Sequence, residues 1–138
     1  MLDMENKVFL DTNIILDFVD SDRVTHGAVV SLFQKLFYSQ AEIYICGISI
    51  VNIFYILRKN KNLQKSFIDF IDILSKSVNI VSFSSIALNL AIKDYRNLDL
   101  DLEDLLQAYT AIENGCGVVY TNDTNFPEIN GIEILSCR

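Results

Sequence analysis

Short continuous runs of hydrophobic residues alternate along this chain with segments in which hydrophobic residues recur every three or four positions. The first run, Val8-Phe9-Leu10, closes a segment that begins at Leu2 and stops at a carboxylate, Asp11. Short apolar runs of this kind are typical of strands that are buried on both faces. Four later segments also favour strands: 43–46, 78–83, 117–121 and 132–135.

The segments between these runs predict helices, because their hydrophobic residues fall on one side of a helix with 3.6 residues per turn. Thr25 and Ser49 are suited to cap the second and third helices through their hydroxyl oxygens. Gly115 is suited to end the last helix. The expected helices cover positions 13–19, 25–37, 49–59, 63–75, 84–95 and 102–114.

Strands that alternate with helices imply a parallel sheet covered by helices on both faces. The expected class is therefore α/β, a three-layer α/β/α sandwich around a central, mainly parallel sheet of four to five strands. The length of 138 residues is close to the usual size of one domain, and no internal repeat, low-complexity tract or linker interrupts the chain. We expect a single domain over residues 1–138.

The composition excludes several classes of protein. Hydrophobic residues make up 51% and charged residues 21%, which is ordinary for a globular chain. The most apolar window, 48–57, is far shorter than the roughly 20 residues that span a bilayer, and the acidic start of the chain does not resemble a leader peptide. The three cysteines lack Cys-x-x-Cys spacing, which argues against disulfides and zinc. We expect a cytoplasmic protein with no membrane contact.

The formal net charge of −7 has the wrong sign for a broad basic surface that binds nucleic acid. Bound cations could offset it if several acids are metal ligands, and a basic partner could also balance it. The densest basic cluster lies at the end of the third expected helix and includes Arg58 and Lys59. These two residues have two interpretations, an RNA-phosphate contact or an ordinary solvated helix end.

Acidic and amide side chains follow the expected strands at one edge of the sheet. Asp11 ends the first strand, and Asn52 lies in the first turn of the helix after the second strand. Glu103 and Asp104 open the last helix, and Asp123 follows the fourth strand. Because ligands of parallel sheets bind beyond the carboxyl ends of the strands, we expect all five side chains to reach one site.

A cluster of carboxylates without a matching histidine or cysteine indicates a hard cation, Mg²⁺ or Mn²⁺. Two carboxylates about 4 Å apart repel by about 4 kcal/mol at an effective dielectric of 20, so such a cluster is costly without a cation. The chemistry that needs only a metal and carboxylates is hydrolysis of a phosphodiester. The pattern therefore favours a nuclease.

Each acid also has a structural interpretation. Glu103 and Asp104 would complement the dipole of the last helix, Asp123 would form a turn, and Asp11 would cap the first helix. Acids that lie elsewhere along the pattern are interpreted as surface charge: Asp17, Asp20, Asp22, Glu42, Asp69 and Asp72.

Three motifs together resemble the PIN-domain family, and most of all its VapC-type toxin branch. They are Val8-Phe9-Leu10-Asp11-Thr12-Asn13, Leu102-Glu103-Asp104-Leu105-Leu106-Gln107-Ala108 and Val118-Val119-Tyr120-Thr121-Asn122-Asp123. Each motif alone is weak, but their order and spacing match over nearly the whole chain.

The resemblance implies a Rossmann-like sandwich and a ribonuclease that depends on Mg²⁺ or Mn²⁺. For the toxin branch it also implies a homodimer inhibited by a cognate antitoxin. By position, Asp11, Asp104 and Asp123 take the catalytic, metal-binding acid roles of the family. The residues that match polar groups orienting ligands or water are Thr12, Asn13 and Thr121.

One position departs from the family pattern. Many PIN nucleases have a glutamate after the second strand, where this chain has Asn52. An amide oxygen can still ligate a cation or hold a metal-bound water, but with less electrostatic attraction. Glu103, beside Asp104 and with a longer reach, is a further candidate ligand if it faces the site.

Two alternatives follow from these observations. The first is a catalytically weakened PIN domain that acts as an RNA- or protein-binding module, which the neutral Asn52 invites. The second is a phosphotransfer protein, because receivers and phosphatases also end their first strand with an aspartate. The second is disfavoured because Asn13 stands where such phosphatases have a second aspartate, and no lysine follows Lys93.

Overall fold

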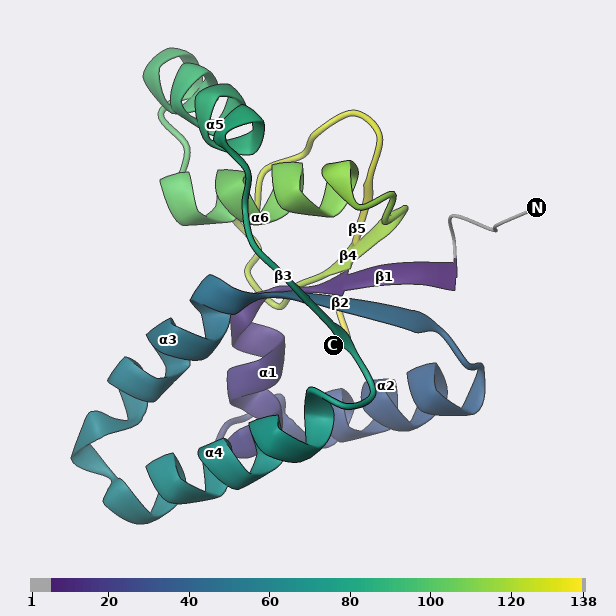
Figure 1. Ribbon diagram of the computed structural model, residues 1–138, viewed down its shortest axis with the longest axis vertical. Helices are drawn as coiled ribbons and strands as arrows, with labels where there is room; N and C mark the ends of the chain where they lie inside the picture. Colours follow the sequence, from purple (N-terminus) through teal and green to yellow (C-terminus); the bar gives the residue numbers. More distant parts are fainter. Residues whose placement is uncertain (1–5, 138) are drawn as a thin grey trace.

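Five short strands form one sheet in the computed structural model, which describes residues 6–137 (Figure 1). The strands are β1 (Lys7–Leu10), β2 (Glu42–Cys46), β3 (Asn79–Val81), β4 (Val118–Tyr120) and β5 (Glu133–Leu135). Their order across the sheet is β3-β2-β1-β4-β5, and each pair of neighbours is parallel. The predicted class is confirmed, with five strands; the start of the first predicted strand, before residue 6, lies outside the described residues.

The central strand β1 supplies both faces of the core. Val8 and Leu10 face one side and Phe9 faces the other, and all three side chains are buried. Phe9 is in register with Tyr44 on β2 and with Val119 on β4. An apolar run with no polar alternation therefore marked a strand that is covered on both faces.

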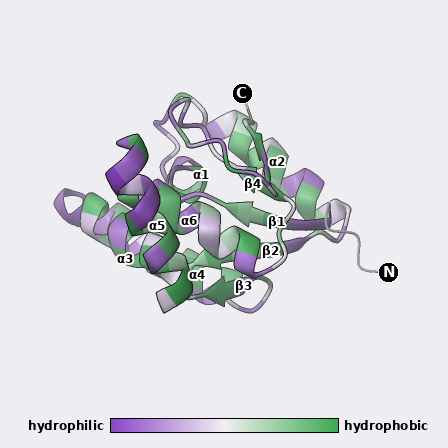
Figure 2. Cartoon of the chain, turned by 90° about the horizontal axis from the view of Figure 1, so that it is seen from above, coloured by the Kyte–Doolittle hydropathy of each residue, from purple (hydrophilic) through white to green (hydrophobic). Residues whose placement is uncertain are grey.

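Four helices cover one face of the sheet, and one covers the other. Figure 1 shows α1, α2, α3 and α4 below the sheet, α6 above it, and α5 outside α6, where Ala91 of α5 packs on Leu105 and Leu106. Figure 2 shows apolar residues along β1 and both hydrophilic and apolar residues on α5. The bounds are α1 (Thr12–Val19), α2 (His26–Tyr38), α3 (Gly47–Ile56), α4 (Lys61–Leu74), α5 (Ser85–Leu98) and α6 (Leu102–Glu113).

One predicted helix cap is wrong, and a second is confirmed in position but not in its hydrogen bond. Helix α3 already begins at Gly47, so Ser49 is not its N-cap but a fully buried residue of its first turn. Thr25 does occupy the N-cap position of α2, but its hydroxyl makes no capping hydrogen bond and donates to the Asp17 carboxylate instead. The predicted stop at Gly115 agrees with its φ of 75°, which favours glycine.

Asp17 was expected to be surface charge and is instead buried, with 3% of its surface exposed. Its carboxylate accepts hydrogen bonds from the Arg23 guanidinium, the Thr25 hydroxyl and the Asn122 amide. Burial opposes the charge of Asp17, but the hydrogen bonds from Thr25, Asn122 and Arg23 outweigh it and lower the pKa of the carboxyl. The acid therefore joins the loop between α1 and α2 to the end of β4.

Three of the four phenylalanines of α2 and α4 belong to the core or pack against it. Phe33 and Phe67 are buried, and Phe70 stacks on Phe18 with ring centroids 4.9 Å apart. Phe37 keeps 47% of its surface exposed. Within residues 6–137, no helix combines the length and the apolar character that crossing a membrane requires.

We expect Asp17→Ala to lower the free energy of unfolding by about 3 kcal/mol, because it leaves three hydrogen-bond donors without their acceptor. Chemical denaturation at neutral pH measures this change. Asp22→Ala, at an exposed position in the same loop, is the matched control and should change stability by no more than about 0.5 kcal/mol. Equal stabilities of the two variants would contradict the assigned role of Asp17.

Candidate active site

Asp11 lies where β1 ends and α1 begins, and 3% of its surface is exposed. As the N-cap of α1 it accepts a hydrogen bond from the Thr12 backbone N–H through Oδ1, at 2.8 Å. Its Oδ2 accepts a second one from the Thr121 hydroxyl, also at 2.8 Å. Both donors fix the carboxylate at the carboxyl edge of the sheet, so the capping and the site interpretations of Asp11 hold together.

Asn13 and Thr121 connect α1 to the loop after β4. The Asn13 amide donates to the Thr121 hydroxyl at 3.3 Å and accepts from the Asn122 backbone N–H at 3.1 Å. The Asp123 backbone N–H donates to the same Thr121 hydroxyl at 3.0 Å. These bonds hold Asp123 beside Asp11, and they connect through Asn122 to the buried Asp17.

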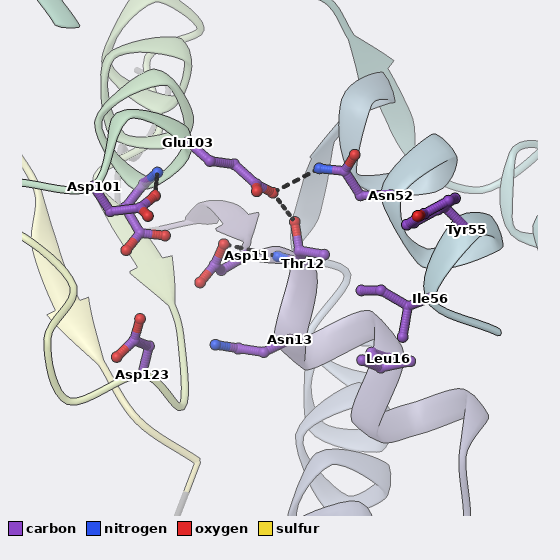
Figure 3. Close-up of a pocket in the computed structure, with 11 residues that line it drawn as sticks. Asp11, Thr12, Asn13, Leu16, Asn52, Tyr55, Ile56, Asp101, Glu103 and Asp123 are labelled. Carbon is purple, nitrogen blue, oxygen red and sulfur yellow. Dashed lines mark hydrogen bonds between the residues drawn. The ribbon is translucent and has the colours of Figure 1, made fainter.

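The N-terminus of α6 brings the remaining acids to this edge. Asp101 is the N-cap of α6 and accepts a hydrogen bond from the Asp104 backbone N–H at 3.0 Å. Glu103 does not face solvent: its Oε1 accepts from the Asn52 amide at 2.9 Å and from the Thr12 hydroxyl at 3.2 Å (Figure 3). Helix α6 therefore directs two carboxylates, those of Glu103 and Asp104, toward the same cleft.

Asn52 reaches the site, and its amide nitrogen donates to Glu103, a contact that the sequence analysis did not predict. The prediction that its amide oxygen ligates a cation or holds a metal-bound water stays a prediction. Figure 3 shows the Asn52 nitrogen directed at the Glu103 carboxylate across the cleft. The reason is electrostatic, since an amide N–H beside an ionised carboxylate gains a charge-assisted hydrogen bond.

Most of the predicted site residues line one cleft of about 400 Å³, although Thr121 does not. Leu16, Tyr55 and Ile56 give it an apolar wall, and these three were not predicted. Its polar lining is formed by Asp11, Thr12, Asn13, Asn52, Asp101, Glu103, Asp104 and Asp123 (Figure 3).

Two of the acids have strongly raised pKa values. Burial raises the pKa of Asp11 to about 6, against the hydrogen bonds from Thr121 and Thr12, and the charges of Glu103 and Asp123 raise it further. Burial also raises the pKa of Asp104 to about 7, and the charge of Asp11 is the largest of several carboxylate contributions. The carboxylates therefore repel one another across the cleft, and a cation would relieve this repulsion.

The donor chemistry of the cleft fits a hard divalent cation, because all of its acidic ligands are carboxylates and no histidine or cysteine lines it. Within residues 6–137, however, no three side chains of the usual ligand types are gathered closely enough to enclose an ion as they stand. The ligand types fit, and a bound ion would require the acids to approach one another.

Some residues of the site escaped the sequence analysis. Ser49 and Gln107 are fully buried behind the cleft, and the Gln107 amide donates to the hydroxyls of Ser49 and Thr12 at 2.8 and 3.0 Å. Gln107 lies four residues after Glu103, so both project from one face of α6. A glutamine within the apolar stripe of that helix was the available signal.

The basic residues lie at the rim. The Arg58 guanidinium stacks over the Tyr55 ring, 4.0 Å from its centroid, and Tyr55 lines the cleft. Lys59 is exposed in the 3-10 helix Leu57–Lys59 that follows α3. Neither basic residue lines the cleft itself.

Comparison with known proteins identifies the family. The model of the PIN domain family matches residues 8–132, nearly the whole chain. The chain belongs to the PIN domain family. A PIN relative, Ribonuclease VapC1 of Aquifex aeolicus, is 29% identical over 136 residues, which covers 94% of this chain and 90% of that protein.

Solved structures of PIN proteins share the fold. A chain of DNA-bound VapBC from Salmonella typhimurium superposes with a TM-score of 0.72 at 17% identity, covering 96% of this chain and 98% of that chain. Mycobacterium tuberculosis VapC20, a toxin that cleaves the sarcin-ricin loop, superposes with a TM-score of 0.70 at 14% identity, covering 86% and 92%. Within the PIN family the chain is VapC-like.

The raised pKa values of this PIN site make stability depend on pH. Between pH 3.8 and about 7 the folded protein retains protons on Asp11 and Asp104 that the unfolded chain has already lost. Stability contributed by these two groups is therefore present at acid pH and falls as pH rises through this window.

We expect Asp104→Asn, without added metal, to raise the Tm at pH 8, by about 3 °C for each kcal/mol of repulsion relieved. At pH 5 the Tm difference from the unsubstituted protein should be smaller, because Asp104 is then protonated and neutral. Thermal unfolding followed by circular dichroism at both pH values measures this. Asp72→Asn, on the exposed face of α4, should show no such pH-dependent gain. A Tm of Asp104→Asn at or below that of the unsubstituted protein at pH 8 would contradict the assigned repulsion.

Proposed function

We propose that this VapC-like protein is an endoribonuclease that depends on Mg²⁺ or Mn²⁺ and serves as the toxin of a toxin-antitoxin pair. The observation that carries the proposal is the convergence of Asp11, Asp104 and Asp123 on one cleft at the carboxyl edge of the sheet. Three acids from separate elements, two of them with pKa values raised to about 6 and 7, suit a site that is completed by a cation.

In this proposal Asp11, Asp104 and Asp123 hold the cation. When bound, a divalent cation acidifies water and neutralises charge that develops on a phosphate during hydrolysis. Asp11 is the most firmly oriented of the three, because the Thr12 backbone and the Thr121 hydroxyl occupy both of its oxygens. Thr12, Asn13 and Thr121 act through the position of Asp11 and Asp123.

The substrate in this proposal is RNA, by similarity to a relative that is named a ribonuclease and to a solved structure described as a toxin that cleaves the sarcin-ricin loop. An uncompensated acidic cleft repels a phosphate backbone, so a cation at the three acids would make the cleft accessible to RNA. Arg58, stacked on Tyr55 at the rim, would add one phosphate contact beside it.

The partner in this proposal is a cognate antitoxin, because several solved neighbours are toxin-antitoxin complexes, one of them from Klebsiella pneumoniae. A net charge of −7 would favour basic segments in such a partner. We further propose a homodimer that acts in the cytoplasm and a single PIN domain over residues 1–138.

We expect Asp11→Asn to reduce RNA cleavage by about 10³-fold, because it removes one of the charges that hold the cation, worth several kcal/mol in the transition state. The unsubstituted protein should cleave RNA with Mg²⁺ or Mn²⁺ and be inactive with EDTA. Its expression should arrest growth, and expression of Asp11→Asn should not. Glu133→Gln is the matched control, because it removes a carboxylate at the start of β5, where the amino ends of the strands lie and away from the cleft.

The outcomes separate the enzyme from a binding module. Equal cleavage by the unsubstituted protein and Asp11→Asn would remove Asp11 from the mechanism. Intact RNA at every protein concentration, together with no thermal shift in millimolar Mn²⁺, would favour the catalytically weakened module that the neutral Asn52 suggests.

We expect Arg58→Ala, measured in the Asp11→Asn background to prevent cleavage, to weaken binding to single-stranded RNA. The slope of log K for RNA binding against log salt concentration should also become less steep, by about the amount that one lost phosphate contact accounts for. Fluorescence anisotropy at several salt concentrations measures both quantities. Lys76→Ala, between α4 and β3 and thus near the opposite edge, is the control. An unchanged slope would assign Arg58 to the solvated end of the helix.

A further inference from the structure

A chain of hydrogen bonds runs from the buried interior to Glu103. The Gln107 amide nitrogen donates to the hydroxyls of both Ser49 and Thr12. The Thr12 hydroxyl has one proton and donates it to Glu103 at 3.2 Å, so the 2.7 Å contact between Ser49 and Thr12 uses the proton of Ser49. Every donor in this chain thus points toward the Glu103 carboxylate.

The orientation of Gln107 supports this direction. Its Oε1 is the one buried side-chain oxygen or nitrogen within residues 6–137 that has no hydrogen-bond partner. Turning the amide around would leave two buried N–H protons unpaired and would draw the hydroxyl protons of Ser49 and Thr12 inward, away from Glu103. In the observed orientation the Gln107 Oε1 acceptor stays unpaired, and the hydroxyl protons of Ser49 and Thr12 remain directed toward the Glu103 carboxylate.

A second donor reaches Glu103 from α3. The Asn52 amide donates to the same Oε1 at 2.9 Å, from the opposite wall of the cleft (Figure 3). Two donors on one carboxylate oxygen fix its position. Glu103 also lines the same cleft as Asp11 and Asp104, so its carboxylate belongs to the acidic cluster by position.

We infer that Glu103 is the fourth acid of this site, delivered by α6, and that Asn52 is the residue that positions it. Asn52 on α3 is neutral, and the charge of this hydrogen-bonded pair lies across the cleft on Glu103 of α6. This inference rests on the proposed nuclease function.

An exchange of the two residues tests the inference. Glu103→Gln should weaken Mn²⁺ binding about tenfold and slow RNA cleavage about 100-fold, because one carboxylate is lost. The double variant Asn52→Glu/Glu103→Gln returns the carboxylate to the cleft, with the amide now donating from α6. It should recover both Mn²⁺ affinity and cleavage to within about tenfold of the unsubstituted protein. Calorimetric titration of Mn²⁺ gives a measurement that does not depend on activity.

Two further variants complete the experiment. Asn52→Leu keeps the Glu103 charge but removes its positioning donor, so it should slow cleavage more than it weakens Mn²⁺ binding. Glu133→Gln removes one carboxylate outside the site and should change neither quantity. Circular dichroism confirms that each variant is folded, and the double variant keeps the test decisive if Glu103→Gln alone is unstable.

The inference is overturned if Glu103→Gln binds Mn²⁺ and cleaves RNA like the unsubstituted protein while Asp11→Asn loses both. Failure of the double variant to recover either quantity would overturn the exchange of roles between Asn52 and Glu103. If the unsubstituted protein itself neither binds Mn²⁺ nor cleaves RNA, the proposed function fails, and that result is distinguishable from the other two.

Discussion

Burial of a charged side chain at the end of the central strand is the constraint on which the site depends. Asp11 continues directly from Val8, Phe9 and Leu10, which are packed on both faces of the sheet, so its backbone cannot move without disturbing both cores. Its charge is therefore held where water is scarce, and its pKa rises to about 6. The remaining polar groups are arranged around this fixed point, either as donors to it or as charges that oppose it.

The balance of these interactions favours function over stability. Donors from Thr12 and Thr121 lower the cost of burying Asp11, but the nearby acids raise it again. Asp17, by contrast, has three donors including a guanidinium, and the pKa of its carboxyl falls. Asp17 lies within α1 and Asp11 is its N-cap, yet the two buried carboxylates have different surroundings. The charge of Asp17 is balanced by the Arg23 guanidinium, whereas Asp11 has no cationic partner among the described residues.

The fold and the location of the site could be predicted because both depend on patterns that repeat. Apolar runs predicted the strands, and apolar residues at helical spacing predicted the helices. The parallel topology then predicted that Asp11, Asp104 and Asp123 lie at one edge of the sheet. Roles that depend on single long-range contacts could not be predicted in this way. The burial of Asp17 is an example, since one of its three donors, Asn122, is distant in sequence and reaches it only in the folded chain.

The same limit applies to the polar residues of the site. Ser49 resembled a helix cap until its contacts with Thr12 and Gln107 were known. The direction of the Asn52 amide was equally inaccessible, because it depends on the position of Glu103 on another helix. A sequence pattern shows which residues lie at the same edge of the sheet. Which side chain donates and which accepts a hydrogen bond depends on how the helices that carry them pack together.

The division of the acids between sheet and helix has a mechanical consequence. Asp11 and Asp123 belong to the ends of neighbouring strands, whereas Glu103 and Asp104 travel with the first turn of α6. Gln107 lies one turn further along α6, and its amide donates hydrogen bonds to the Thr12 hydroxyl on α1 and the Ser49 hydroxyl on α3. The spacing between the two pairs of acids therefore depends on how the buried face of α6 packs, and a substitution in that face would change the spacing without altering any of the acids.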